Sequence, residues 1–364
     1  MPLALPDFPW NSLLPFREAA AAHPDGIVDL AIGSPVDPVP ALIRDALAAA
    51  VDTPGYPATQ GSPEVRAAIV GWYARHGVEI GVENAIPTIG SKEFIATLPT
   101  LLGLGAGDVV VHPTVAYPTY EVGARIAGAE PVAADDPDDW PAATKLVWLN
   151  SPGNPDGTVH GLEFLRRAVA RAREIGAVIA NDECYTELNW EGDAATPSIL
   201  HPEVTQGSRR LTLAVHSLSK RSNLAGYRAG FVAGCSDLIA EILEARKHAG
   251  LIPPAPVQHA MAVALGDDAH VAEQKARYGE RRAALRAALE TAGFRIDGSR
   301  AGLYLWATRA EDCWSTIATL ADLGILATPG SFYGAASGEH VRFSLTATDE
   351  RIAAAVARLA SSSN

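Results

Sequence analysis

The 364-residue sequence is poor in cysteine and in positive charge, and each shortage excludes classes of protein. Its three cysteines, Cys184, Cys235 and Cys313, are far apart and form no C-x-x-C pair. They predict neither a disulfide framework nor a metal site, and they are typical of a reducing cytoplasm. Lys and Arg number 29 against 42 Asp and Glu, a formal net charge of −13. We therefore expect no nucleic acid and no anionic membrane surface as a partner.

Long apolar runs and targeting signals are also missing. No stretch of the chain approaches the roughly 20 apolar residues of a membrane helix. The first residues, MPLALPDFPWNSLLPF, carry early prolines and an aspartate but no basic segment, so a signal peptide is not expected. With 48% hydrophobic and 20% charged residues the composition is globular. We expect a cytoplasmic protein of more than one lobe, because 364 residues exceed one ordinary core.

Short apolar runs alternate with helical patterns through the first 250 residues. The expected strands are 108–112, 131–134, 145–149, 177–181, 211–216 and 227–233. This alternation predicts an α/β fold with a mostly parallel sheet flanked by helices. The later segments read as helices (255–265, 268–292, 349–359) and shorter strands (294–297, 303–307, 341–346). The predicted division is an N-terminal arm with part of the small domain (1–37), a large domain (38–250) and a smaller α+β domain (251–364).

The densest polar loop lies between the last two of those expected large-domain strands. It holds Ser217, Ser219 and Lys220, and Arg228 follows eight residues after the lysine. Hydroxyl and guanidinium groups suit an oxyanion such as a phosphate. A lysine that is partly desolvated beside other cations becomes a nucleophilic amine, which a Schiff base requires. For this loop alone, a solvated basic turn is the simpler alternative.

Two neighbouring carboxylates, Asp182 and Glu183, follow the strand 177–181, with Tyr185 close behind. An aspartate there could hold a protonated heterocyclic nitrogen through a charge-assisted hydrogen bond. The same pair could bind Mg²⁺ in a P-loop enzyme, but that reading fails because no Gly-Lys pair occurs in the sequence. A strand end with a purely structural role remains open.

Two more loops could bind a ligand. LNSPGNPDG presents Asn150 and Asn154, and an asparagine followed by proline is a well-oriented donor for a phenolate oxygen, unless the loop is an ordinary turn. TIGSKE places Ser91 and Lys92 at a helix start, where free N–H groups favour an anion.

Two single side chains also stand out. Tyr117 could stack on an aromatic ligand or lie in the core. Arg342 lies within the apolar strand VRFSLTA, so we expect it either to meet a carboxylate or to face solvent at a sheet edge.

Taken together, these motifs resemble one family, the fold-type I, pyridoxal-phosphate-dependent aminotransferases of class I/II. The resemblance runs over nearly the whole chain, through IGSP, GYPATQG, TIGSKE, AYPTY, NSPGNPDG, NDECY, SLSKRSNLAGYR and VRFSLTAT. It implies the PLP-dependent transferase fold, with a seven-stranded sheet in the large domain. It also implies pyridoxal 5'-phosphate as cofactor, amino acid and 2-oxo acid substrates, and a homodimer with shared active sites.

The resemblance also implies a role for each matching residue. Lys220 would form the internal aldimine and shuttle a proton, Asp182 would pair with the pyridine nitrogen, and Tyr185 would hydrogen-bond the ring hydroxyl. The other residues that would bind the cofactor are Ser91 and Lys92 (through backbone N–H groups), Tyr117, Asn154, Ser217, Ser219 and Arg228, with Tyr56 reaching the neighbouring subunit's phosphate. Arg342 would clamp the substrate α-carboxylate, helped by Gly33 and Asn154.

Two positions depart from the family pattern. The usual N-P-T-G is N-P-D-G here, at 154–157, and Asp serves such a turn as well as Thr. Arg221 follows the lysine where many relatives carry a smaller residue. It could add positive charge near the phosphate or contact a distal carboxylate of the substrate, but we expect it to face solvent.

The nearest resemblance within the family is to actinobacterial N-succinyldiaminopimelate aminotransferases, through HPDGIVDL, GYPAT, RKHAG and LTATDER. It implies glutamate as amino donor and N-succinyl-2-amino-6-oxopimelate as acceptor, in lysine and diaminopimelate biosynthesis. The basic residues that could hold its distal carboxylates are Arg17, Arg221, Lys247 and His248. An aminotransferase for aspartate or another amino acid, and a carbon–sulfur β-lyase, are the alternatives. A transcription regulator is disfavoured, because no length or basic segment remains for a DNA-binding module.

Overall fold

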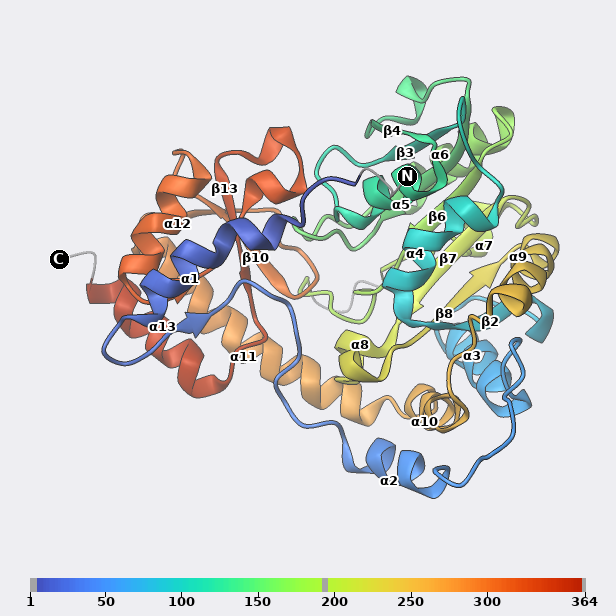
Figure 1. Cartoon of the computed structure of the whole chain (residues 1–364), viewed down its shortest axis with the longest axis horizontal. Helices are drawn as coiled ribbons and strands as arrows, with labels where there is room; N and C mark the ends of the chain where they lie inside the picture. Colours follow the sequence, from blue (N-terminus) through green and yellow to red (C-terminus); the bar gives the residue numbers. More distant parts are fainter. Residues whose placement is uncertain (1–4, 192–195, 362–364) are drawn as a thin grey trace.

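The computed structural model describes residues 5–191 and 196–361 of the chain. It forms two lobes that lie side by side in Figure 1. The larger lobe is built on a seven-stranded sheet and the smaller one on a four-stranded sheet. The expectation of an α/β large domain with a smaller α+β domain is confirmed.

The large sheet has the strand order β2-β8-β7-β6-β5-β3-β4. Its strands are β2 (Ala85–Ile89), β3 (Val109–His112), β4 (Glu130–Ala133), β5 (Thr144–Asn150), β6 (Val178–Asp182), β7 (Thr212–Ser217) and β8 (Ala229–Gly234). Only β8 runs antiparallel to its neighbours. Sequence analysis did not identify β2, because Pro87 interrupts its apolar run. The strand lies at the sheet edge, where a missing N–H group is tolerated.

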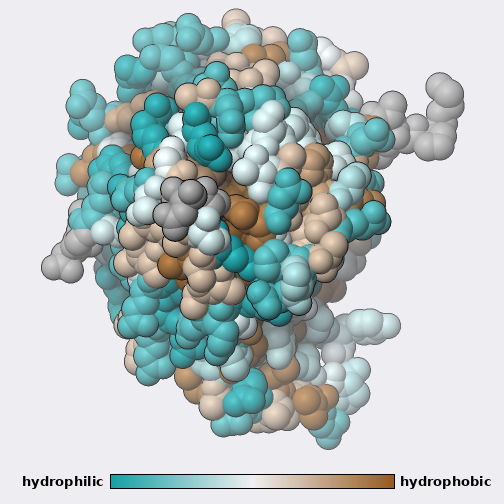
Figure 2. Space-filling view, turned by 90° about the vertical axis from the view of Figure 1, so that its left-hand side faces the viewer, coloured by the Kyte–Doolittle hydropathy of each residue, from teal (hydrophilic) through white to brown (hydrophobic). Residues whose placement is uncertain are grey.

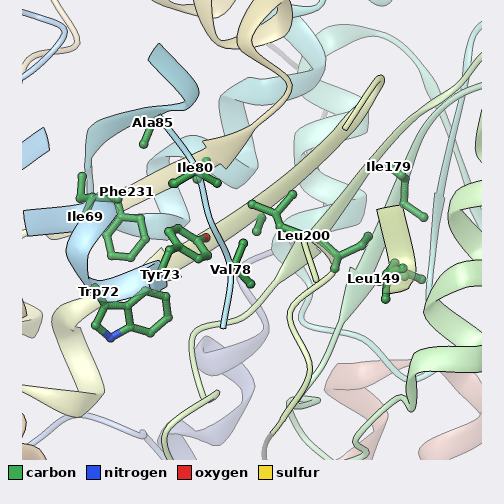
Figure 3. Packing of buried hydrophobic residues seen from close by; sticks show 14 of the residues in the cluster. Ile69, Trp72, Tyr73, Val78, Ile80, Ala85, Leu149, Ile179, Leu200 and Phe231 are labelled. Carbon is green, nitrogen blue, oxygen red and sulfur yellow. The ribbon is translucent and has the colours of Figure 1, made fainter. Parts of the chain in front are cut away.

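Both faces of this sheet are buried, and successive residues of one strand enter opposite cores. Val109 and Val111 belong to one cluster of buried side chains and Val110 to the other. This explains why the strands read as continuous apolar runs in the sequence. In Figure 3, Trp72 and Tyr73 pack together with Phe231 of β8 in the first cluster.

Helices cover both faces of the sheet. They are α2 (Ala41–Ala49), α3 (Pro63–Arg75), α4 (Gly90–Leu101), α5 (Thr119–Ala127), α6 (Leu162–Glu174), α7 (Pro202–Thr205), α8 (Leu218–Arg221), α9 (Ser236–Ala249) and α10 (Ala255–Leu265). Helix α10 packs against α2 and α3 of the large lobe. The predicted boundary after residue 250 stays a prediction.

The small lobe contains the antiparallel sheet β12-β13-β10-β9 and a separate parallel pair, β1 and β11. Its strands are β1 (Val28–Asp29), β9 (Arg295–Asp297), β10 (Tyr304–Thr308), β11 (Ile325–Leu326), β12 (Thr328–Pro329) and β13 (His340–Ser344). Its helices are α1 (Leu14–Ala21), α11 (Ala269–Thr291), α12 (Cys313–Asp322) and α13 (Asp349–Ser361). The long helix α11 runs from this lobe toward α10 in Figure 1.

The N-terminal arm belongs to the small lobe over part of its length. After a short 3-10 helix, η1 (Pro9–Leu13), the chain forms α1, which packs against α12. Figure 2 shows that the outer end of the small lobe is mostly hydrophilic, with apolar side chains scattered between the polar ones. Within residues 5–191 and 196–361, no helix combines the length and apolarity that a bilayer crossing needs.

Candidate active site

A cavity of about 340 Å³ opens where strands β5, β6 and β7 of the large sheet end. Asn150, Asp182 and Ser217 are the last residues of these strands, and all three line the cavity. The carboxyl ends of parallel strands are where α/β sheets bind ligands. The residues singled out from the sequence that line it are Gly33, Ser91, Lys92, Tyr117, Asn154, Asp182, Tyr185, Ser217, Ser219, Lys220, Arg228 and Arg342.

Lys220 lies on the short helix α8, directly after strand β7. Ser217 caps this helix, because its Oγ accepts a hydrogen bond from the Ser219 backbone N–H at 3.1 Å. The Lys220 amine donates to the Gly33 carbonyl, across the cavity from β7. Burial lowers the pKa of Lys220, and the positive charge of Arg342 lowers it further, although Tyr304 opposes the shift. A larger fraction of this amine is therefore neutral, as a nucleophile requires.

Asp182 is a buried carboxylate with only neutral donors around it. Tyr120 donates its hydroxyl to Oδ2 at 3.0 Å, and the Cys184 backbone N–H donates to Oδ1 at 3.2 Å. Burial raises the pKa of Asp182, and these donors oppose that shift. A buried carboxylate of this kind gains most from a cationic partner, such as a protonated ring nitrogen.

Three groups of oxyanion donors meet at one end of the cavity. The helix α4 begins at Gly90, so the free N–H groups of its first turn belong to Ser91 and its neighbours. The Ser217 hydroxyl donates to the Ser219 hydroxyl at 2.9 Å. A Cβ atom on Gly90 would lie 2.4 Å from Arg228 Nη2, so only glycine allows the guanidinium to come this close to the helix start. Helix dipole, hydroxyls and guanidinium together suit a phosphate.

Arg342 lies in β13, between β12 and β10, and is buried. Its Nη1 donates to Asn154 Oδ1 at 2.8 Å and its Nη2 to the Ala31 carbonyl at 2.6 Å. Nε has no partner within the described residues. The expectation of a carboxylate partner or an edge position was wrong, since the partners are neutral and the strand is internal. A desolvated cation without a counter-ion is suited to an anionic ligand.

Tyr304 is a site residue that sequence analysis missed. Its hydroxyl lies 3.1 Å from the Tyr185 hydroxyl, and its ring centroid lies 3.9 Å from the Arg342 guanidinium carbon. Burial opposes ionisation, but the charges of Arg342 and Lys220 lower the pKa of Tyr304. Within the apolar strand LYLW, a tyrosine reads as a core residue, and no local signal reveals that long-range contacts place it here. Tyr120, which donates to Asp182 from helix α5, was also not singled out from the sequence.

Several residues with expected roles lie outside the cavity. Tyr56 is fully exposed on a loop, so its expected contact with a neighbouring subunit stays a prediction. Arg17 pairs with Asp29 at 2.7 Å. Lys247 pairs with Glu244 at 2.6 Å on helix α9. Neither of these cations, nor His248, lines the cavity of the described chain, so their expected role at a distal carboxylate stays a prediction.

The expectation that Arg221 faces solvent was wrong. Its side chain is buried, and Nη2 donates to Glu187 Oε1 at 3.1 Å while Nε contacts Oε2 of the same carboxylate. Nη1 donates to the Ala264 carbonyl at 3.0 Å. Arg221 thus fixes α8 to Glu187 and to the Ala264 carbonyl. It does not line the cavity, so it is not placed to contact a phosphate or a substrate there.

The residues present fit pyridoxal phosphate. An amine with a lowered pKa, a buried carboxylate without a cationic partner, and a phosphate cradle all line one cavity. Tyr117 adds a half-buried aromatic ring, and desolvation raises its pKa to about 12, so it remains neutral.

Comparison with known proteins agrees with this geometry. The family model "Aminotransferase class I and II" matches residues 25–359, and the chain belongs to this family. Its members and its fold-type I structural neighbours depend on pyridoxal phosphate. The enzyme is therefore an aminotransferase that uses this cofactor.

Particular relatives are similar over nearly the whole chain. The 4-dedimethylamino-4-oxo-anhydrotetracycline transaminase OxyQ of Streptomyces rimosus is 55% identical, over 98% of this chain and 99% of its own. The probable aminotransferase Rv1178 of Mycobacterium tuberculosis is also 55% identical, over 98% and 85%. An LL-diaminopimelate aminotransferase of Dehalococcoides mccartyi is 32% identical, over 93% and 92%.

Solved structures show the same fold. An aminotransferase of Neisseria meningitidis superposes with a TM-score of 0.90 at 29% identity, over 99% of this chain and 98% of that one. A probable N-succinyldiaminopimelate aminotransferase of Thermus thermophilus gives a TM-score of 0.87 at 27% identity, over 97% and 99%.

Proposed function

We propose that this enzyme transfers the amino group between glutamate and N-succinyl-2-amino-6-oxopimelate, forming N-succinyl-LL-2,6-diaminopimelate in lysine biosynthesis. The observation that carries an amino-acid substrate is the buried Arg342 guanidinium, which has only neutral partners in the cavity that holds Lys220. Support for the particular acceptor comes from the sequence motifs and from the name of the Thermus relative, a probable N-succinyldiaminopimelate aminotransferase. The Dehalococcoides relative is named for LL-diaminopimelate without the succinyl group.

Each site residue has a proposed task. Asp182 would pair with the ring nitrogen of the cofactor, while Asn154 and Tyr185 would hydrogen-bond its ring hydroxyl. The groups that hold the phosphate are Ser91, Lys92 (both through backbone N–H), Ser217, Ser219 and Arg228, with Tyr56 contributed to the partner subunit of a homodimer. Tyr117 would stack on the ring. When bound, the cofactor supplies an electron sink for the bonds of the substrate Cα atom.

The substrate is oriented and deprotonated by the chain itself. Arg342 binds the α-carboxylate through its two-pronged guanidinium, with Gly33 and Asn154 beside it. Lys220 would hold the cofactor covalently, and its free amine would take the proton from the substrate Cα and later return it as general acid. The neutral state of the amine, favoured by its burial, is the one that can act as base.

A second candidate substrate is a large ketone. The OxyQ relative is named for an amination on anhydrotetracycline, and it is as similar to this chain as the Mycobacterium relative. Phe8, Trp10 and Tyr117 are among the aromatic residues that line the cavity, and their rings could hold a polycyclic substrate.

A single-turnover experiment on the holoenzyme distinguishes these substrates. Glutamate, N-succinyl-LL-diaminopimelate, aspartate and cysteine are added one at a time, and the change in cofactor absorbance is followed. Response to both glutamate and the succinylated compound is expected. A response to glutamate alone removes the proposed acceptor and leaves the large ketone to be assayed. Pyruvate released from cysteine, with the cofactor spectrum restored, would mean a β-lyase.

Arg342→Lys tests the carboxylate clamp. A lysine keeps the charge but loses the planar fork, so KM is expected to rise about 10- to 100-fold for every amino donor. Steady-state kinetics with glutamate and norvaline measure this, because both carry an α-carboxylate. Arg125→Lys, at an exposed pair with Glu121, is the control. An unchanged KM for both donors in Arg342→Lys would contradict the assignment.

A further inference from the structure

Two tyrosine hydroxyls meet inside the cavity, one from each lobe. Tyr185 follows strand β6 of the large sheet, and Tyr304 is the first residue of strand β10 in the small lobe. Both side chains are buried and line the cavity, and their hydroxyl groups are hydrogen-bonded at 3.1 Å. Their rings meet edge to face, with centroids 5.8 Å apart. Tyr185 has a proposed task at the cofactor, whereas Tyr304 has none so far.

The small sheet and Gly33 fix the position of Tyr304. In the antiparallel pair of β10 and β13, Tyr304 lies opposite Ser344, so it is a diagonal neighbour of Arg342 on the same face. Its ring covers the Arg342 guanidinium, with 3.9 Å between the ring centroid and the guanidinium carbon. A Cβ atom on Gly33 would lie 2.8 Å from two ring carbons of Tyr304 and closer still to its hydroxyl oxygen. Glycine at this position therefore leaves the room that Tyr304 needs to reach Tyr185.

Two neighbouring cations decide which of the two hydroxyls donates. Burial opposes ionisation of Tyr304, but the charges of Arg342 and Lys220 outweigh it and lower the pKa of this phenol. Burial raises the pKa of Tyr185. Of two neutral phenols, the more acidic one is the better donor and the other the better acceptor, so Tyr304 donates to the Tyr185 oxygen. The hydrogen of Tyr185 is then free for an acceptor in the cavity, and the bond that Tyr185 accepts strengthens the bond that it donates.

The surroundings of Tyr304 contain further titratable groups. Those that interact with it electrostatically are Arg342 of β13, Lys220 of α8, Cys184 and Tyr185 after β6, Tyr117 before α5, Tyr278 of α11 and Tyr333 of the small lobe. Burial raises the pKa of the Cys184 thiol and of the phenols of Tyr117, Tyr278 and Tyr333. These four groups therefore stay neutral through the pH range in which a lysine-bound cofactor is titrated.

We propose that Tyr304 is a positioning residue that acts through Tyr185: its hydroxyl donates to the Tyr185 oxygen and so directs the Tyr185 hydrogen to the ring oxygen of pyridoxal phosphate. This inference rests on the proposed function, in which Tyr185 hydrogen-bonds that ring oxygen. Tyr304 thereby connects the sheet that carries Arg342 with the residue that contacts the cofactor.

The test is a pH titration of the absorbance of the resting holoenzyme. A hydrogen bond from Tyr185 draws negative charge from the ring oxygen of the cofactor, and that charge holds the proton at the Lys220 nitrogen. Tyr304→Phe makes Tyr185 a weaker donor, so the midpoint of the titration is expected to rise by about 0.5 pH units. Tyr185→Phe loses the whole bond, and the expected rise is about 1–2 pH units. Because Tyr304→Phe keeps an aromatic ring on Arg342, KM for glutamate should not change.

A double-mutant cycle separates action through Tyr185 from a general disturbance of the site. Tyr304→Phe should raise the midpoint in the unaltered enzyme but not in the Tyr185→Phe background, because the group that transmits its effect is then missing. The matched control is Tyr333→Phe. It removes another buried phenol hydroxyl near the same cation, with 5.1 Å between ring centroid and guanidinium carbon, and should leave the midpoint unchanged.

The possible results separate the role of Tyr304 from that of Tyr185. If Tyr185→Phe raises the midpoint and Tyr304→Phe does not, the role of Tyr304 alone is overturned. An equal rise from Tyr304→Phe in both backgrounds, or the same rise in Tyr333→Phe, also overturns its action through Tyr185. A midpoint that Tyr185→Phe leaves unchanged overturns the proposed task of Tyr185 and this inference with it.

Discussion

Replacing Lys220 by alanine is expected to lower turnover by about 10⁴-fold or more, because covalent attachment and proton transfer are lost together. The fold should survive, since the amine makes one hydrogen bond, to the Gly33 carbonyl. The purified variant should also lack the absorbance band of lysine-linked cofactor, and circular dichroism should match that of the unaltered protein.

The control for this substitution is Lys247→Ala, an exposed lysine on α9. It should keep both the absorbance band and the turnover. Addition of methylamine to Lys220→Ala is expected to restore a small part of the activity, because a free amine can take the proton in place of the side chain. If Lys220→Ala turned over substrate as fast as the Lys247→Ala control, the proposed role of Lys220 in cofactor attachment and proton transfer would be contradicted.

Replacing Glu187 by alanine is expected to lower the free energy of unfolding by about 3–5 kcal/mol, because one partner of a buried ion pair then has no counter-charge. Arg221 is 2% exposed and Glu187 is its main partner. The other nearby carboxylate, that of Asp268, is 3.9 Å away and largely exposed. Glu187 also accepts a hydrogen bond from Trp72 Nε1 at 3.4 Å, so the substitution leaves the indole N–H without this acceptor. Urea unfolding at fixed protein and cofactor concentration measures the change.

The matched control is Glu121→Ala, which breaks an exposed i,i+4 pair with Arg125 and should cost about 0.5 kcal/mol or less. The two substitutions should also differ in their dependence on pH. Burial opposes ionisation of Glu187, but His216 and Arg221 outweigh it and hold its pKa well below the usual range. The stabilisation is therefore present above the ordinary glutamate pKa of about 4.3 and is lost as the pH falls toward the folded-state pKa. Equal losses in Glu187→Ala and Glu121→Ala would contradict the buried pair.

The sequence was a good guide to the strands and to the loops that carry chemistry. The runs at 177–181 and 211–216 became β6 and β7 nearly to the residue, and Asp182 and Lys220 line one cavity. These predictions depend on local signals, since apolar runs mark buried strands and polar loops follow them. In a parallel sheet, loops that follow neighbouring strands meet at one edge, so the position of the site follows from the topology.

The partners of the charged side chains were not predictable in this way. Arg221 looked like a solvated cation and is buried against Glu187, and Arg342 was expected to meet a carboxylate and meets Asn154 instead. Both contacts join residues far apart in the chain, Arg342 and Asn154 by 188 positions. Nothing in the residues adjacent to a charge reveals such a partner, because burial and pairing depend on how distant parts of the chain pack together.

The amino-acid pattern alone therefore defined the α/β architecture, the cofactor class through family motifs, and the loops that form the site. It did so because strand periodicity and turn chemistry act over a few residues. The folded chain settled which cations are free to meet a ligand. Arg342 is left without a carboxylate in the described structure, whereas Arg17, Arg221 and Lys247 each have one. That distinction arises from long-range contacts, since a charge is available for substrate only where no other part of the chain neutralises it.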